Sequence, residues 1–165
     1  MEQINVFSTY VSRQTKGQKV IQMFMGEYNH TVDAKGRLIV PSKFRDQLGN
    51  EFVMTRGLDG CIFVYSSEEW KITEAKFREA PQFSKKVRQL ERFFITGAAV
   101  CEVDKQGRVL IPPHLREHAG IEKEIVSAGA VNRIEIWSKD RWQDMNEFDD
   151  VEEIAEQMAD LGLTI

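Results

Sequence analysis

Long apolar runs are missing from this chain of 165 residues, and the longest, at Leu38–Val40 and Cys61–Tyr65, span only a few positions. A membrane-spanning helix needs about 20 consecutive apolar residues. Residues 1–22 are polar and contain neither the apolar core nor the small-residue cleavage site of a signal peptide. We therefore expect a cytoplasmic protein without a membrane partner.

Cysteine is scarce as well, because the chain contains only Cys61 and Cys101. Two cysteines do not make the disulfide framework of a small secreted domain. Each lies within an apolar stretch, and one disulfide between them remains an alternative. We favour two buried, reduced thiols, because cytoplasmic proteins keep their cysteines reduced and free cysteine is among the most buried residue types.

The motifs of common enzyme classes are also missing. The chain has no phosphate-binding loop, no nucleophile elbow and no glycine-rich dinucleotide fingerprint. His114 and His118 stand four apart, which is a metal-ligand spacing, but no third ligand forms a recognisable set with them. We favour structural or surface histidines, and we expect no metal, no cofactor and no enzymatic activity.

An excess of positive charge is absent, since the chain has 22 basic and 26 acidic residues and a net charge of −4. Nucleic-acid binding proteins often carry a basic surface, so the distribution of charge matters. Residues 138–165 contain two basic and nine acidic residues, which accounts for the acidity of the whole chain. The remainder is near neutral and can still form a local basic surface.

The chain contains two copies of a ten-residue motif: "VDAKGRLIVP" at Val32–Pro41 and "VDKQGRVLIP" at Val103–Pro112. Further matches follow in the same order once a single residue is inserted in the second copy. This pattern predicts an internal duplication into two fused half-domains. The identical pairs are Val32/Val103, Asp33/Asp104, Gly36/Gly107, Arg37/Arg108, Pro41/Pro112, Arg45/Arg116, Gly49/Gly120, Gly57/Gly129, Ile62/Ile134, Ser66/Ser138 and Trp70/Trp142.

Each copy predicts a hairpin, a short helix and a second hairpin. In the first copy, strands are expected near 28–32 and 38–40, and Pro41 suits the start of a helix that Gly49 ends. Phe44 and Leu48 share one face of that helix. Longer helices are expected from about 67 to 94, broken by Pro81, and from about 139 to 163.

A ββαββ half cannot close a barrel alone, but two halves can pair their strands into one small β-barrel without exposed edges. We therefore predict an α+β fold, with a small β-barrel built from two tandem ββαββ half-units and flanking helices.

The paired Asp-x-x-x-Arg motifs, Asp33–Arg37 and Asp104–Arg108, resemble the signature motifs of the MraZ family of bacterial transcriptional regulators. The stretch "MFMGEYNHTVDAKGRLIVPSKFR" from Met23 is similar to the start of such proteins. The resemblance covers residues 23–165 and extends to the AbrB- and SpoVT-type swapped-hairpin barrels. It implies three parts: an extension at 1–22, expected to be disordered, a first AbrB-like repeat at 23–94, and a second at 95–165 that ends in an acidic helix.

The resemblance also implies a function. Members of the family form ring-shaped homo-oligomers and bind tandem repeats in promoter DNA, and they regulate their own division and cell-wall gene cluster. It therefore implies a cytoplasmic, nucleoid-associated repressor that partners with double-stranded DNA. The alternative is a barrel-type protein-interaction or antitoxin-like module that uses the acidic tail and makes no direct DNA contact.

The basic residues of the motifs are the candidate DNA contacts. Glycine at the fourth position of "DAKGR" allows a positive φ, and aspartate can accept turn N–H groups. If the segment is extended, Lys35 and Arg37 point to one face. The residues alone favour a simpler reading, in which Asp and Arg only pair across the turn, whereas the resemblance assigns Arg37 to DNA.

The second copy carries Gln106 at the Lys35 position, so we rank the first copy higher. For Lys43, Arg45, Arg56 and Arg116, a solvated helix face or barrel rim is favoured over DNA, and 85–92 is expected to be a packing helix. The candidate DNA-binding residues are Lys35, Arg37, Lys105, Arg108, Lys43 and Arg45, and the structural residues of the motifs are Asp33, Gly36, Asp104 and Gly107.

Overall fold

The computed structural model describes residues 23–165, and the extension expected at 1–22 lies outside the described residues. The first unit contains β1 (Glu27–Thr31), β2 (Arg37–Ile39), α2 (Ser42–Leu48), β3 (Glu51–Arg56) and β4 (Ile62–Ser66), followed by α3 (Ser67–Glu79) and α4 (Lys85–Gly97). The second contains β5 (Ala99–Glu102), β6 (Arg108–Leu110), α5 (Pro113–His118), β7 (Glu124–Gly129) and β8 (Ile134–Ser138), followed by α6 (Lys139–Met145) and α7 (Val151–Ala159). The predicted α+β fold with two ββαββ half-units and flanking helices is confirmed.

The two units exchange strands. A six-stranded antiparallel sheet has the order β1-β7-β8-β4-β3-β5, so the first strand of each unit pairs with the second hairpin of the other. Glu27–Thr31 runs beside Glu124–Gly129, and Ala99–Glu102 runs beside Glu51–Arg56. Each half-unit therefore completes its sheet only with a strand from the other half.

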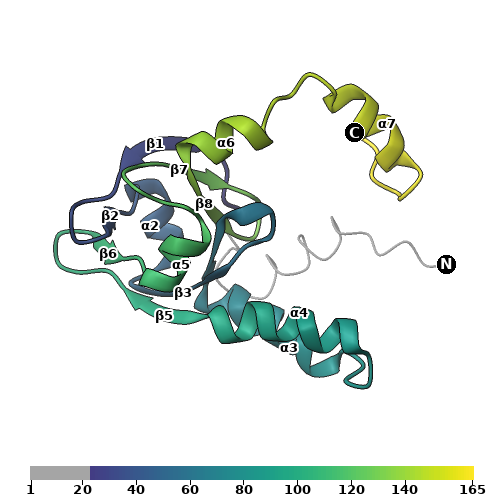
Figure 1. Ribbon diagram of the computed structural model, residues 1–165, viewed down its shortest axis with the longest axis horizontal. Helices are drawn as coiled ribbons and strands as arrows, with labels where there is room; N and C mark the ends of the chain where they lie inside the picture. The colour runs from purple at the N-terminus through teal and green to yellow at the C-terminus, as the bar shows by residue number, and fades with distance from the viewer. Residues whose placement is uncertain (1–22) are drawn as a thin grey trace, which may run out of the picture.

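A two-stranded ribbon, β2 with β6, covers the space between the edge strands β1 and β5 (Figure 1). Leu38 lies opposite Val109 at its centre, and both side chains are buried. The Val40 N–H donates to the Gly107 carbonyl at 3.0 Å, and the Ile111 N–H donates to the Gly36 carbonyl at 3.0 Å. These reciprocal bonds relate the two units by an approximate two-fold axis through the ribbon.

The strand register corrects the predicted alignment of the two copies. Phe52 lies opposite Ser66, and its counterpart Ile125 lies opposite Ser138. Relative to the first unit, the second unit therefore has two extra residues between its short helix and β7. It then has one residue fewer in the turn between β7 and β8. The prediction had a single insertion instead. Sequence identity alone could not detect this, because two changes of opposite sign nearly cancel.

The predicted pairing of Gly57 with Gly129 is consequently wrong. The Gly57 N–H closes the β3–β4 turn on the Cys61 carbonyl at 2.7 Å. Gly129 ends β7, and its N–H bonds to the Gly26 carbonyl at 2.8 Å. The two glycines serve different local structures, because the hairpin turns lie outside the shared core and differ in length.

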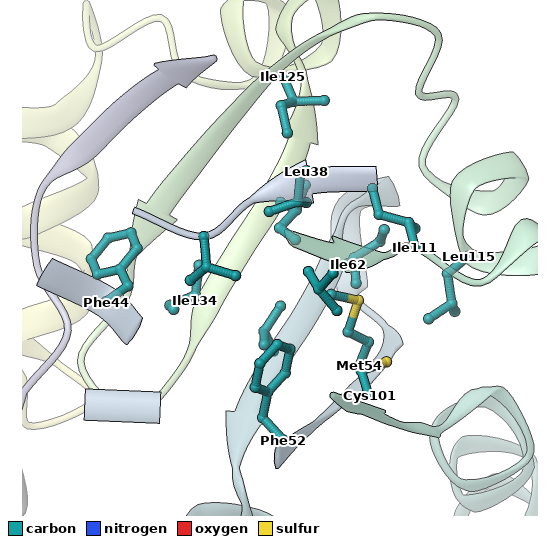
Figure 2. Close-up of a cluster of buried hydrophobic side chains, with 14 of the residues drawn as sticks. Leu38, Phe44, Phe52, Met54, Ile62, Cys101, Ile111, Leu115, Ile125 and Ile134 are labelled. Carbon is teal, nitrogen blue, oxygen red and sulfur yellow. The ribbon is translucent and has the colours of Figure 1, made fainter. Parts of the chain in front are cut away.

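Side chains from both units fill the barrel interior (Figure 2). Phe44 and Leu48, predicted to share a helix face, are both buried, and Leu115 of the second short helix is fully buried. A second cluster lies where the helices cover the hairpins; its buried members are Cys61, Phe63, Tyr65, Phe94, Val126 and Trp137. The central hairpins are therefore apolar on both faces.

The long helical stretch after the first unit breaks as predicted at Pro81, with α3 ending at Glu79 and α4 beginning at Lys85. The expectation that 85–92 belongs to a packing helix is also confirmed, because Phe94 and Gly97 of the same helix are buried and α4 packs on β3. Figure 1 shows α3 and α4 side by side, extending away from the barrel.

The single helix expected from 139 to 163 is wrong. The structure contains two helices, α6 and α7, separated at 146–150. Asn146 has φ −122 and ψ 43 and ends α6, and the following "EFDD" places three carboxylates in one short stretch. Asparagine and aspartate favour turns and caps over helix interiors, so the helix stops there.

Both cysteines are free and buried, which confirms the prediction of two reduced thiols. Burial raises the pKa of the Cys101 thiol to about 11 and also raises the pKa of Cys61. Because the thiolate is the reactive form, burial makes these side chains part of the core instead of reactive groups.

We predict that Leu115→Ala lowers the free energy of unfolding by about 2–5 kcal/mol, since it removes a fully buried side chain and leaves a cavity. Leu110→Ala is the matched control, because Leu110 is 52% exposed and should change stability by less than about 0.5 kcal/mol. Urea unfolding followed by circular dichroism measures both. Equal effects of the two substitutions would contradict the assignment of the core.

Candidate nucleic-acid interface

The first motif is a closed turn held by one carboxylate. Oδ1 of Asp33 accepts the backbone N–H groups of Lys35 and Arg37, both at 2.9 Å, and Oδ2 accepts Nε–H of Arg37 at 2.7 Å. Gly36 has φ +80, a conformation that residues with a Cβ rarely adopt. The Asp–Arg pairing that the residues alone favoured is therefore present.

The second motif repeats this geometry. Oδ1 of Asp104 accepts the N–H groups of Gln106 at 2.8 Å and Arg108 at 2.9 Å, and Oδ2 accepts Nε–H of Arg108 at 2.8 Å. Gly107 has φ +77. Because the internal contacts of the two turns agree to within 0.1 Å, any functional difference between them must come from other side chains.

The motif carboxylates stay ionised over the physiological range. The backbone N–H of Arg37 is the main cause that holds the pKa of Asp33 below its usual value, and Arg108 does the same for Asp104. A carboxyl with a lowered pKa stabilises the folded state above its unfolded pKa and loses that contribution as the pH falls through its folded pKa. The turns therefore remain closed at neutral pH.

Each turn is backed by an arginine from the opposite unit. Nη1 of Arg116, from α5, lies where a Cβ on Gly36 would sit, and Nη1 of Arg45, from α2, does the same at Gly107. Glycine is thus favoured at each turn by its positive φ, and a Cβ there would also displace the end of the arginine side chain. Sequence order grouped Arg45 with the first motif, whereas the structure places it at the second.

The predicted lysines lie on the surface. Lys35 and Lys105 are exposed within their turns, and Lys43 is exposed in the first turn of α2. Lys35 sits in a turn and not in an extended strand, so the strand alternation that we used to align it with Arg37 does not apply. Its backbone N–H and that of Arg37 are instead gathered by the Asp33 carboxylate.

The outer face of the β2–β6 ribbon joins the two motifs. Arg37 lies opposite Leu110, and Ile39 lies opposite Arg108. Directly opposed residues and residues two apart on a strand share one face of a sheet, so these four side chains, two on each strand, lie together on the outer face; we call this set of four the outer row. The sequence analysis did not single out Ile39 and Leu110, although the position of each, two residues after a motif arginine, carries the signal.

The flanks of the two motifs differ in charge. Beside the second motif, Glu51 and Glu102 lie directly opposite each other on β3 and β5. Beside the first, Thr31 faces Glu124, and the Glu124 carboxylate pairs with Nζ of Lys139 at 3.5 Å. Within residues 23–165, neither Glu51 nor Glu102 makes an ion pair, so these two carboxylates beside the second motif are not neutralised by a basic partner.

The remaining basic and histidine candidates bond to the protein itself. Nη1 of Arg56 donates to the Phe93 carbonyl at 3.1 Å and ties α4 to β3, which agrees with the favoured barrel-rim reading. Nε2 of His114 lies 2.9 Å from the Gly97 carbonyl, and Nε2 of His118 lies 3.1 Å from the Gly57 carbonyl. The two histidines thus bond to different segments of backbone.

His30 is the third histidine. Burial lowers its pKa, and its Nε2 lies 2.7 Å from Oγ of Ser127. Across the described part of the chain, no group of three His, Cys, Asp or Glu side chains could hold a metal ion. In that same part, no helix is both long and apolar enough to span a membrane.

Comparison with known proteins identifies the family of this chain. A model of the family described as "MraZ protein, putative antitoxin-like" matches the chain twice, over residues 23–93 and 94–162. The transcriptional regulator MraZ of Lachnoclostridium phytofermentans is 58% identical over 142 residues, which cover 86% of this chain and 99% of that protein.

Two further relatives give the same result. The transcriptional regulator MraZ of Thermoanaerobacter sp. is 55% identical over 143 residues, covering 86% of this chain and all of that protein. That of Ligilactobacillus salivarius is 55% identical over 146 residues, with the same coverage. These names describe regulators and not enzymes. With its doubled motif and these identities, the chain belongs to the MraZ family of transcriptional regulators.

Proposed function

We propose that this chain is a sequence-specific DNA-binding repressor of its own division and cell-wall gene cluster, acting at the nucleoid. A ring-shaped homo-oligomer would present the turn arginines of several subunits to tandem repeats in the promoter. The observation that carries the proposal is the orientation of Arg37, because Asp33 holds its Nε while the side chain stays 27% exposed.

A fixed arginine suits base recognition. Its guanidinium can donate two parallel hydrogen bonds to O6 and N7 of guanine, the commonest specific contact in the major groove. An exposed ion pair such as Asp33–Arg37 adds little to folding stability. The ion pair instead positions the Arg37 guanidinium for binding, because a side chain already held in place loses less conformational freedom when it binds.

Lys35 and Arg116 would add phosphate contacts around the first turn, and Lys43 and Arg45 of α2 would add them around the second. Phosphate contacts fix the register of a protein on DNA, while base contacts specify the sequence. The net charge of −4 keeps general attraction to DNA low. A single subunit would therefore bind weakly, and several subunits on successive repeats would bind tightly through effective concentration.

Exposed apolar side chains on α4 and α7 support self-association. Leu90 on α4 is 46% exposed among basic neighbours that include Lys86 and Arg88, and Ile154 on α7 is 52% exposed among acidic neighbours that include Glu153. Figure 1 shows α7 standing away from the barrel, so its apolar side is uncovered within one chain. Opposite charge around apolar patches fits contact between α7 of one subunit and α4 of the next.

We predict that Arg37→Ala weakens binding to the chain's own upstream DNA at least about tenfold, as expected for a lost bidentate base contact. Arg108→Ala should have a smaller effect, because Glu51 and Glu102 border that motif. Fluorescence anisotropy at several salt concentrations measures the affinity. Unchanged affinity for Arg37→Ala would contradict the contact, and a larger loss for Arg108→Ala would reverse the order of the motifs.

The same titration separates the two functions considered. DNA binding through phosphates weakens steeply as salt rises, because condensed counterions are released on binding. A protein-interaction module would show no salt-dependent affinity for the promoter duplex. Failure of the unmodified protein to bind this duplex would favour that module.

We predict that Asp33→Asn also weakens promoter binding, although it makes the protein more positive. The substitution removes the acceptor that orients Arg37 and leaves Arg37 itself in place. A purely electrostatic attraction would instead strengthen. Glu79→Gln, at the exposed end of α3 and outside both motifs, has the same change of charge and serves as the control, measured by anisotropy beside the unmodified protein. Tighter binding by Asp33→Asn would contradict the positioning role.

We predict that Leu90→Asp and Ile154→Asp each shift the protein from an oligomer toward the 19.0 kDa of a single chain. A buried carboxylate in an apolar contact is costly unless it is paired. Light scattering coupled to size-exclusion chromatography measures the mass. Leu58→Asp, at a 51% exposed position on the β3–β4 turn, is the control and should leave the mass unchanged.

A further inference from the structure

The outer row of the ribbon contains two aliphatic side chains that the motif arginines do not explain. Ile39 is 60% exposed and Leu110 is 52% exposed, while Leu38 and Val109 on the inner face are buried. Each aliphatic lies directly opposite a motif arginine, Ile39 opposite Arg108 and Leu110 opposite Arg37. Each end of the ribbon therefore presents one arginine and one aliphatic side chain on its outer face, with the two arginines on one diagonal and the two aliphatics on the other.

Folding does not account for these two residues. Their side chains point away from the barrel interior, and neither belongs to a buried cluster. Along β1, the outward positions are the polar Glu27, Asn29 and Thr31. Exposed aliphatics at the two ends of the ribbon, each directly opposite an arginine, instead fit a surface that meets an anionic partner with an apolar feature of its own.

DNA offers such a feature in the major groove. The groove admits a two-stranded β-ribbon, and each thymine displays its 5-methyl group there. The arginines suit guanine edges or phosphates, and the aliphatic side chain opposite each arginine would meet a neighbouring base pair. Thymine is the base that presents an apolar group, its 5-methyl, in the major groove.

We propose that Ile39 and Leu110 are specificity-determining residues that contact thymine methyl groups in the promoter repeats. This inference rests on the proposed function. It adds a direct apolar readout to the hydrogen bonds of Arg37, and it makes the ribbon, and not the turns alone, the surface that reads the DNA. Repeats that lack thymine beside the bases that the motif arginines contact would bind less tightly.

The test removes only the methyl group. Thymines of the upstream repeats are replaced by deoxyuridine, which keeps base pairing and charge, and affinities are measured by anisotropy. We expect the unmodified protein to bind the deoxyuridine duplex about fourfold more weakly for each methyl group it contacts. The double variant Ile39→Ala/Leu110→Ala should bind the two duplexes equally, because the partner of the methyl group is gone.

Val100→Ala provides the matched control. Val100 is an aliphatic on β5 that is 67% exposed and lies outside the ribbon, so this variant should keep the preference for thymine. Circular dichroism and light scattering establish that each variant is folded and assembled. The ratio of the two affinities is the decisive quantity, since it is insensitive to the fraction of active protein.

Three results would overturn the inference. The unmodified protein could bind both duplexes equally while still requiring Arg37, which would leave the proposed function intact. The double variant could lose the same factor on both duplexes, which would point to a contact with the sugar-phosphate backbone. The double variant could also lose its oligomeric mass, which would make the row a contact between subunits. If the unmodified protein did not bind the promoter duplex, or if Arg37→Ala left its binding unchanged, the proposed function itself would be contradicted.

Discussion

Everything in this structure depends on the reciprocal contact between the two motifs. The glycine carbonyl of each turn accepts an N–H from the strand end of the other unit, and an arginine from the other unit occupies the space beside each glycine. A side chain at Gly36 or Gly107 would collide with that arginine. Each turn is closed by its own aspartate, and it is also packed against the opposite unit through these contacts.

Because of this contact, the β2–β6 ribbon carries core residues on one face and the candidate DNA contacts on the other. The inner face of the ribbon buries Leu38 and Val109 in the barrel, while the outer face presents Arg37 and Arg108. The packed core restrains the backbone of this short ribbon, and it therefore restrains the positions of the two arginines. The exchange of strands between the units joins the two hairpins into one sheet and at the same time builds the surface proposed to meet DNA.

Duplication also allows the two copies to diverge. The turns have nearly identical internal geometry, yet Glu51 and Glu102 flank one of them, while the carboxylate of Glu124 beside the other pairs with Lys139. Interactions within a turn depend on a few consecutive residues and have been retained in both copies. The charge around a turn depends on strands that arrive from elsewhere in the chain and differs between them.

Local features were predictable from the sequence by itself, because they depend on neighbours in the chain. Asp33 can gather the N–H groups two and four residues ahead, Pro81 breaks a helix, and Phe44 and Leu48 share a face wherever that helix packs. The family motif, which lies within these local segments, was recognisable for the same reason. The break at 146–150 was missed, since apolar residues on either side continue a helical pattern across it.

Only the tertiary structure decided which distant residues meet. The placement of Arg45 at the second motif and the row formed by Arg37, Ile39, Arg108 and Leu110 follow from antiparallel pairing between strands some 70 residues apart in the chain. Periodicity tells which face of a strand is buried, but it does not tell which strand lies beside it. The residues of the motif were thus determined locally, and the surface that they form was determined by how the two halves pack.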